Sequence, residues 1–266
     1  MTLEGHPAVQ RLLRVGGAWQ VLEHHTELTS TLDVALARAQ QGAGAGLVVV
    51  ADHQRAGRGR AGRAWRDAPS VDASLLLAAV ADAPGGDTPL VPLAAGLAVT
   101  DATRSAGVET ALKWPNDVLA GGAKCAGVLV ERHAIDGRDL VLVGIGIDLD
   151  WRGIRREGEA ASWTSLAEFA DRSLDRGQLL ADVLTALADR LSQLRADRTG
   201  LLAAYRRRCA TIGRDVDVSL PATSALHGRA VEVDGDGRLV VATPDGRVTV
   251  DAGDVVHVRP VHPAGG

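Results

Sequence analysis

The apolar positions of the chain follow two different spacings, which together predict a mixture of strands and helices. Continuous apolar runs at 46–52 and 73–80, bounded by glycine or polar residues, are typical of buried strands. Leucine and valine at helical spacing along 178–194 predict a helix with one apolar face. Three further helices are expected at 29–42, 89–107 and 201–210. Ser30 or Thr29 is positioned to cap the first of these.

Two groups of shorter strands complete the pattern. Strands at 111–114 and 117–120 precede a Gly121–Gly122 turn, after which longer strands are expected at 125–133 and 140–149. The first 25 residues carry weaker signals that fit a short helix or strand.

The sequence pattern changes near residue 212 from helical spacing to short strands. Short strands then alternate with the Asp-Gly turns at 236–237 and 245–246, which is typical of antiparallel hairpins. We therefore expect a main domain at 1–211 and a small, separate β-barrel domain at 212–266.

Composition narrows the class of protein. With 46% hydrophobic residues the chain can form a substantial core, and a net charge of −4 argues against nucleic-acid binding through overall charge. No apolar run is long enough to span a membrane, and no secretory signal is visible. Two cysteines are too few for a disulfide framework or a structural zinc site. We expect a cytoplasmic protein without a nucleic-acid or membrane partner and without a protein-held metal.

Residues 54–65, QRAGRGRAGRAW, gather four arginines among three glycines. The glycines match G-x-G-x-x-G after a strand, but no helix follows, so a dinucleotide-binding fold is rejected. A kinase-type glycine loop also fails, because no catalytic-loop signature follows. Glycine backbones can approach a ligand closely, and arginines present forked donors to carboxylates and phosphates. We interpret the stretch as a site for a small anion, in preference to a solvated surface loop or an RNA-binding segment.

Lys113 and Lys124 are the only lysines among 29 basic residues. They flank LKWPND and the Gly121–Gly122 turn, which should bring both toward one side of a hairpin. The alternative is a hairpin with incidental charges, since WPND is a good turn sequence in its own right. A cleft shared with the arginine-rich stretch is the interpretation we favour.

Four motifs, taken in order, give the chain a family resemblance. GRGRAGRAW, KWPNDVL, KCAGVLVE and GIGIDLD together resemble biotin protein ligases of the short form, which lack an N-terminal DNA-binding domain. The resemblance implies an α+β fold, with a mixed sheet flanked by helices as in class II synthetases and biotin–lipoate ligases. It also implies a small C-terminal SH3-like barrel.

The same resemblance implies a two-step reaction. Biotin and MgATP would form biotinyl-5′-AMP and pyrophosphate, and a lysine of a biotin carboxyl carrier domain would then accept the biotinyl group. A homodimer formed through the sheet is one oligomeric state that the family allows. A related lipoate or octanoate ligase and a protein that sequesters an adenylate without transfer remain as alternatives.

Residue roles follow from the matched motif positions. The implied catalytic residues are Lys124, Arg60 and Lys113. The implied biotin contacts are Ser30, Thr31, Leu32, Gln54, Arg58, Gly59, Arg60 and Lys124. The implied ATP contacts are Arg58, Arg63, Trp65, Lys113, Asn116, Asp117 and Asp148.

Three positions depart from the family pattern. Leu32 stands where the family has asparagine, which puts that biotin contact in doubt. Asp148 replaces another asparagine, so that an acid either recruits metal beside the nucleotide or points away from it. Cys125 follows Lys124 in an apolar setting, and we interpret it as a small core residue and not a nucleophile. His24, His25 and His53 lack metal-ligand spacing and are interpreted as structural.

Overall fold

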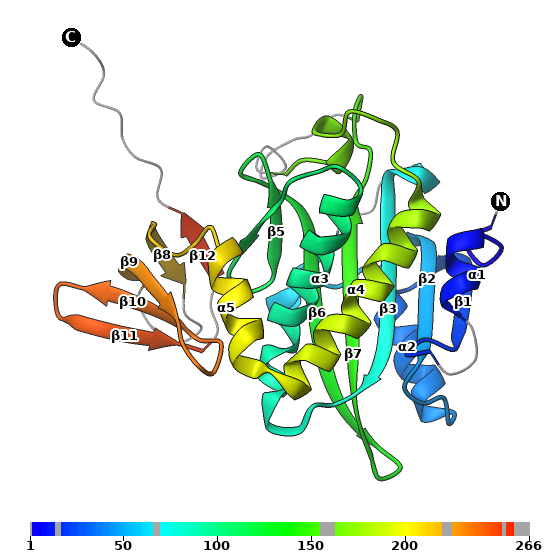
Figure 1. Cartoon of the computed structure of the whole chain (residues 1–266), viewed down its shortest axis with the longest axis horizontal. Helices are drawn as coiled ribbons and strands as arrows, with labels where there is room; N and C mark the ends of the chain where they lie inside the picture. Colours follow the sequence, from blue (N-terminus) through cyan, green and yellow to red (C-terminus); the bar gives the residue numbers. More distant parts are fainter. Residues whose placement is uncertain are drawn as a thin grey trace.

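A computed structural model describes residues 2–13, 17–65, 70–154, 163–219, 225–251 and 254–257. Two sheets form its framework. The smaller sheet lies at the left of Figure 1, and the larger sheet occupies its centre and right, on the side of the N-terminus. The helices gather around the larger sheet.

The larger sheet has seven strands in the order β1-β2-β3-β7-β6-β5-β4. β1 and β2 run parallel, whereas the other neighbouring pairs are antiparallel. Its strands are β1 (Val21–Leu28), β2 (Leu47–Gln54), β3 (Ser74–Asp82), β4 (Ala111–Lys113), β5 (Asp117–Ala120), β6 (Ala123–Ile135) and β7 (Arg138–Asp148). The mixed sheet expected from the sequence is thus confirmed.

Both faces of this sheet are covered, which explains why its central strands are continuous apolar runs. Val48 and Val50 of β2 pack into the cluster that contains α3 and α4, while Val49 faces the cluster that contains α2. The helices are α1 (Pro7–Leu12), α2 (Thr31–Gln40), α3 (Val91–Ser105), α4 (Arg176–Ala196) and α5 (Arg198–Arg208). Short 3₁₀ turns occur at Arg60–Gly62, Val71–Ala73, Gly85–Leu90 and Leu166–Glu168.

The helices expected from periodicity are present. Ser30 occupies the N-cap position of α2 as expected, although its side chain makes no capping hydrogen bond. The weakly patterned N-terminal stretch contains both α1 and the beginning of β1.

The smaller sheet is antiparallel and has five strands in the order β11-β10-β9-β8-β12. They are β8 (Asp215–Ser219), β9 (Leu226–Val233), β10 (Leu239–Thr243), β11 (Gly246–Val250) and β12 (Asp254–His257). Both Asp-Gly turns join hairpins as expected. In the described part of the chain, however, no pairing of β11 with β12 closes the expected barrel. The division at residues 211 and 212 stays a prediction.

Trp114 joins the two sheets. Its indole Nε1 donates to the carbonyl of Gly237 at 2.8 Å, and its backbone N–H donates to Thr211 Oγ1 at 3.0 Å. The Arg206 guanidinium also donates to the carbonyl of Val233 at 2.6 Å. The smaller sheet is therefore attached beside the short strand β4.

Among the residues described, no helix combines the length and apolar character needed to cross a bilayer.

Candidate active site

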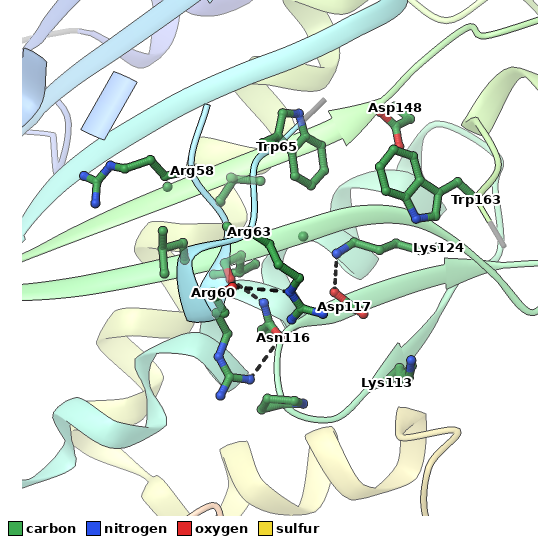
Figure 2. Close-up of a pocket in the computed structure, with 18 of the residues that line it drawn as sticks. Arg58, Arg60, Arg63, Trp65, Lys113, Asn116, Asp117, Lys124, Asp148 and Trp163 are labelled. Atoms are coloured by element: carbon green, nitrogen blue, oxygen red, sulfur yellow. Dashed lines mark hydrogen bonds and ion pairs between the residues drawn. The ribbon is translucent and has the colours of Figure 1, made fainter. Parts of the chain in front are cut away.

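A cavity of about 860 Å³ opens where the arginine-rich and lysine-rich segments meet. We call residues 57–65 the arginine loop and residues 111–124 the lysine hairpin. Figure 2 shows Arg60 and Arg63 of the arginine loop beside Asn116 and Lys124 of the lysine hairpin. The shared cleft expected from the sequence is thus confirmed. All of the sequence-predicted site residues lie on its lining: Ser30, Thr31, Leu32, Gln54, Arg58, Gly59, Arg60, Arg63, Trp65, Lys113, Asn116, Asp117, Lys124 and Asp148.

The arginine loop is a narrow turn held by backbone hydrogen bonds. Trp65 N donates to Gly57 O at 2.8 Å, and Gly59 N donates to Arg63 O at 2.7 Å. Gly62 has φ +73°, a left-handed conformation that glycine adopts without steric cost. A Cβ on Gly57 would lie 3.0 to 3.1 Å from atoms of Gln54 and Trp65. Glycine therefore permits both the turn and the close approach of its two arms.

Successive arginines of this loop point in different directions. Arg60 Nη1 donates to Asn116 Oδ1 of the lysine hairpin at 3.2 Å, and Arg63 Nε donates to Arg60 O at 3.3 Å. Arg58 instead extends to the opposite side in Figure 2 and pairs with Asp33 and Glu131. Arg60 therefore links loop and hairpin across the cavity.

The lysine hairpin is held by its turn and its backbone. Lys113 and Asp117 are opposite each other in the β4–β5 pair, on either side of a cis Trp114–Pro115 bond. Asn116 attaches this turn to β6 through two hydrogen bonds with the backbone of Val128. Its side-chain Nδ2 donates to Val128 O at 2.7 Å, and its backbone carbonyl accepts from Val128 N at 3.0 Å. Asn116 and Asp117 are thereby presented to the cavity in fixed positions.

Lys124 lies at the beginning of β6, beyond the Gly121–Gly122 turn. Its Nζ is 2.5 Å from Asp117 Oδ1 and 5.6 Å from the centre of the Trp65 ring. An ammonium held between a carboxylate and an aromatic face is positioned by both. This places a positive charge at the junction of the loop and the hairpin.

Glycines form one wall of the cavity behind Trp65. A Cβ on Gly146 would lie 2.5 to 2.6 Å from the Trp65 indole, and a Cβ on Gly127 would lie 3.0 Å from it. The Trp65 Nε1 atom is buried and has no hydrogen-bond partner. The two glycines therefore leave room for the Trp65 indole to lie directly against the backbone of β6 and β7.

The N-terminus of α2 forms another wall. Gln54 Oε1 accepts from the backbone N of Thr31 at 2.7 Å and from Thr31 Oγ1 at 3.1 Å. Ser30, Thr31 and Leu32 are all buried, and Leu32 lies against Gly144. Leu32 therefore adds an apolar contact to this wall where the family has an amide.

Asp148 is buried at the end of β7 and lines the cavity, so that it does not point away. No group of three or more His, Cys, Asp and Glu side chains in the described ranges could hold a metal ion.

Cys125 is inaccessible and packs within the core. Burial raises the pKa of its thiol to about 12, and the nearby Asp148 carboxylate contributes to the same shift. Its Sγ lies 3.5 Å from Val118 O. Its interpretation as a core residue is confirmed.

The histidine interpretation can be checked at His24, which belongs to a buried ion-pair network away from the cavity lining. His24 Nε2 and Arg176 Nη1 lie 2.8 and 2.7 Å from Asp52 Oδ1. Burial raises the pKa of Asp52, but hydrogen bonds from Arg176 and His24 outweigh that effect and leave it lower than usual. His24 thus has a structural role that connects β1, β2 and α4.

Several lining residues were not predicted from the sequence. Trp163 forms a parallel β-bridge with Lys124, and the backbone N–H of the following residue, Thr164, donates to Lys124 O at 2.8 Å. Arg214, which directly precedes β8, and Val255 and Val256 of β12 also line the cavity. Trp163 follows an aperiodic stretch, and Arg214 lies outside the recognised motifs. Val255 and Val256 belong to AGDVVHV, which resembles the family's C-terminal domain, but no local pattern predicts that this segment reaches the cavity.

Two family models match the chain. The Biotin/lipoate A/B protein ligase family model matches residues 24–150, and the biotin protein ligase C terminal domain model matches residues 211–258. The second match falls on the smaller sheet.

Relatives match along most of their length. The chain is 38% identical over 257 residues to the biotin–[acetyl-CoA-carboxylase] ligase of Mycobacterium tuberculosis, covering 94% of this chain and 93% of that protein. It is 32% identical over 221 residues to the ligase of the same name from Paracoccus denitrificans, covering 78% and 88% respectively.

Solved structures agree with these matches. Biotin protein ligase from Aquifex aeolicus, in complex with biotin and ATP, superimposes with a TM-score of 0.75 and 26% sequence identity. This match covers 91% of the present chain and 100% of the Aquifex chain. Sequence and architecture together show that the chain belongs to the biotin protein ligase family.

Proposed function

We propose that this protein uses ATP to activate biotin as biotinyl-5′-AMP and then transfers the biotinyl group to a lysine of a carrier domain. The observation that carries the proposal is the convergence of the arginine loop and the lysine hairpin on one cavity. Two relatives that match along most of their length support the proposal, because both are named biotin–[acetyl-CoA-carboxylase] ligases.

The first step joins two anions. A carboxylate oxygen of biotin attacks the α-phosphorus of ATP, the bond from that phosphorus to the bridging oxygen breaks, and pyrophosphate leaves. Two unit charges about 4 Å apart repel by about 4 kcal/mol at an effective dielectric constant of 20. ATP would enter as its magnesium complex, in which the cation offsets part of the phosphate charge.

Lys124 is positioned to offset the rest. Its Nζ is held by Asp117 beside the face of Trp65, from where an ammonium on a flexible stem can turn toward an incoming oxygen. Arg60 and Arg63 supply further positive charge from the loop, and Lys113 supplies it from the hairpin. Charge stabilisation of this kind increases as the pentavalent phosphorus forms.

The wall at α2 suits the neutral end of biotin. Ser30, Thr31 and Gln54 contribute hydroxyl and amide groups, while Leu32 contributes an apolar side chain. Asn116, Asp117, Trp65 and Asp148 line the cavity together with its arginines and lysines and are proposed to contact the nucleotide.

In the second step an acceptor lysine amine attacks the carbonyl carbon of the mixed anhydride. An amide forms, AMP leaves with the bonding electron pair, and the amine loses a proton. We propose a biotin carboxyl carrier domain as the acceptor, as the names of the relatives suggest. A homodimer and a cytoplasmic location stay predictions.

The test is mass spectrometry of a biotin-accepting domain incubated with this protein, biotin and MgATP. We expect a mass increase of one biotinyl group per acceptor lysine, with none when ATP is omitted. Lipoate replaces biotin in a parallel reaction, and modification by lipoate alone would favour the lipoate ligase alternative. Tight adenylate binding without biotin-dependent pyrophosphate release would favour sequestration.

A further inference from the structure

Arg58 is bound by two acidic side chains from different elements. Its Nη2 lies 2.9 Å from Asp33 Oδ1 of α2 and donates to Glu131 Oε2 of β6 at 3.2 Å, while its Nη1 donates to Glu131 Oε1. The contact with Glu131 is therefore bidentate. In Figure 2 the guanidinium extends away from Arg60, Arg63 and Lys124.

This arrangement crosses the base of the arginine loop. Arg58 and Ala64 form an isolated antiparallel bridge, so that the backbone of Arg58 is coupled to the arm that leads into Trp65. Between these two residues lie Arg60 and Arg63, which line the cavity. Because a glycine-rich loop loses much conformational entropy when it is fixed, an attachment at its base would favour the closed loop.

We propose that Arg58, Asp33 and Glu131 form a latch that holds the arginine loop closed over the bound acyl-adenylate. The proposal rests on the function proposed above and gives Arg58 a positioning role, in place of the ligand contact implied by the family. It also assigns a role to Glu131, which ends the motif KCAGVLVE without one.

The strength of the latch suits a contact that must open. Side chains of Arg58, Asp33 and Glu131 are 39%, 43% and 21% exposed, so water and salt screen each pair. Exposed pairs of this kind contribute modestly, although two carboxylates and bidentate geometry on one guanidinium increase the sum. A latch of this strength can retain the intermediate and still release the loop in each catalytic cycle.

The experiment compares Glu131→Gln and Asp33→Asn with the wild type. Labelled biotinyl-AMP is formed on the protein from radiolabelled biotin and MgATP, and its release is followed after a chase with unlabelled adenylate. We expect release to accelerate roughly three- to tenfold in each variant, while single-turnover adenylate formation changes less than about twofold. Raising the salt concentration should accelerate release from the wild type more than from the variants.

Arg55→Gln is the matched control. Arg55 precedes the loop and pairs with Glu27 at 2.6 Å, but this ion pair is not attached to the arginine loop. The control should release the adenylate at the wild-type rate. Wild-type release by Glu131→Gln and Asp33→Asn, combined with fast release by Arg58→Gln, would overturn the latch and favour direct ligand contact by Arg58.

A second readout does not depend on activity. Limited trypsin digestion of the ligand-free protein should cut after Arg60 or Arg63 faster in Glu131→Gln than in the wild type, because the loop opens more often. Equal cleavage rates would contradict the latch. A wild type that forms no biotinyl-AMP would contradict the proposed function, and the digestion would then decide the latch on its own.

Discussion

The lysine hairpin and the arginine loop bring positive charge to the same cavity, but they are held in different ways. The hairpin is built on strands, is bound to β6 by Asn116, and has the buried Trp114 at its centre. The loop depends on a few backbone bonds and on exposed arginine–carboxylate pairs at its base.

This difference assigns two tasks to two segments: the hairpin positions Lys124, and the loop controls access to the cavity. A rigid hairpin can keep Lys124 within a narrow range of positions, which electrostatic catalysis requires. A loop held by weak contacts can open to admit biotin and ATP and to expose the adenylate to the acceptor. Variants in the hairpin should therefore affect stability or chemistry, whereas variants in the loop should affect retention of the intermediate.

The largest effect is expected from Trp114→Ala. Removing this buried side chain leaves a cavity and an unsatisfied Gly237 carbonyl, which should lower the free energy of unfolding by about 3–5 kcal/mol. Chemical denaturation with urea measures the change. Trp65→Ala in the arginine loop is the matched control and should cost much less. Equal losses for the two variants would contradict the distinction between rigid and weakly held segments.

Lys124→Ala should slow biotinyl-AMP formation by at least about 10²-fold, which corresponds to about 2.7 kcal/mol of transition-state stabilisation. The measurement is biotin-dependent pyrophosphate release in a single turnover, with a thermal melt to verify that the fold is retained. Lys124→Arg, which keeps the charge on a different head group, should recover part of the rate. An unchanged rate in the alanine variant would remove Lys124 from the mechanism.

Arg60→Gly should affect the retention of biotinyl-AMP more than its formation. Loss of the guanidinium and of its contact with Asn116 should accelerate adenylate release roughly tenfold, with a smaller change in its formation. Free biotinyl-AMP then reacts with exposed amines, so labelling of a protein that lacks an acceptor site should increase. A variant that holds its intermediate as long as the wild type does would disprove this role.

The smallest effect concerns Cys125, which packs within the lysine hairpin region. A thiol with a pKa of about 12 is ionised in only about one molecule in 10⁴ at pH 8, and burial also blocks access. Iodoacetamide should therefore leave Cys125 unmodified in the native protein and alkylate it in denaturant. Cys125→Ala should retain adenylate formation within about twofold. Rapid alkylation of the native thiol would contradict its packing in the core.

The sequence predicted those features that depend on local pattern. Strands such as β2 and β3 were visible because burial on both faces requires continuous apolar residues. The shared cavity was predictable because two motifs with excess positive charge need a common anionic ligand. Roles of individual residues still come from the family resemblance and await the experiments above.

Features that depend on distant partners were not predictable. The direction of Arg58 is determined by Asp33 and Glu131, and no local pattern distinguishes it from Arg60, whose partner is Asn116. Trp163 reaches the cavity through a backbone bridge to Lys124 from an irregular stretch. The hairpin signals predicted the neighbouring strand pairs of the smaller sheet, but such signals do not predict whether its two end strands pair with each other.

The hydrogen bond from Trp114 to Gly237 has a consequence for dissecting this enzyme. Trp114 lies in the middle of the lysine-bearing turn and also anchors the carboxyl-terminal sheet. This sheet contributes Val255 and Val256 to the cavity wall. Truncating the chain after residue 211 would remove the Gly237 carbonyl that accepts from the Trp114 indole, and it would remove the residues of the smaller sheet that line the cavity. The smallest fragment worth expressing for catalysis therefore contains both sheets.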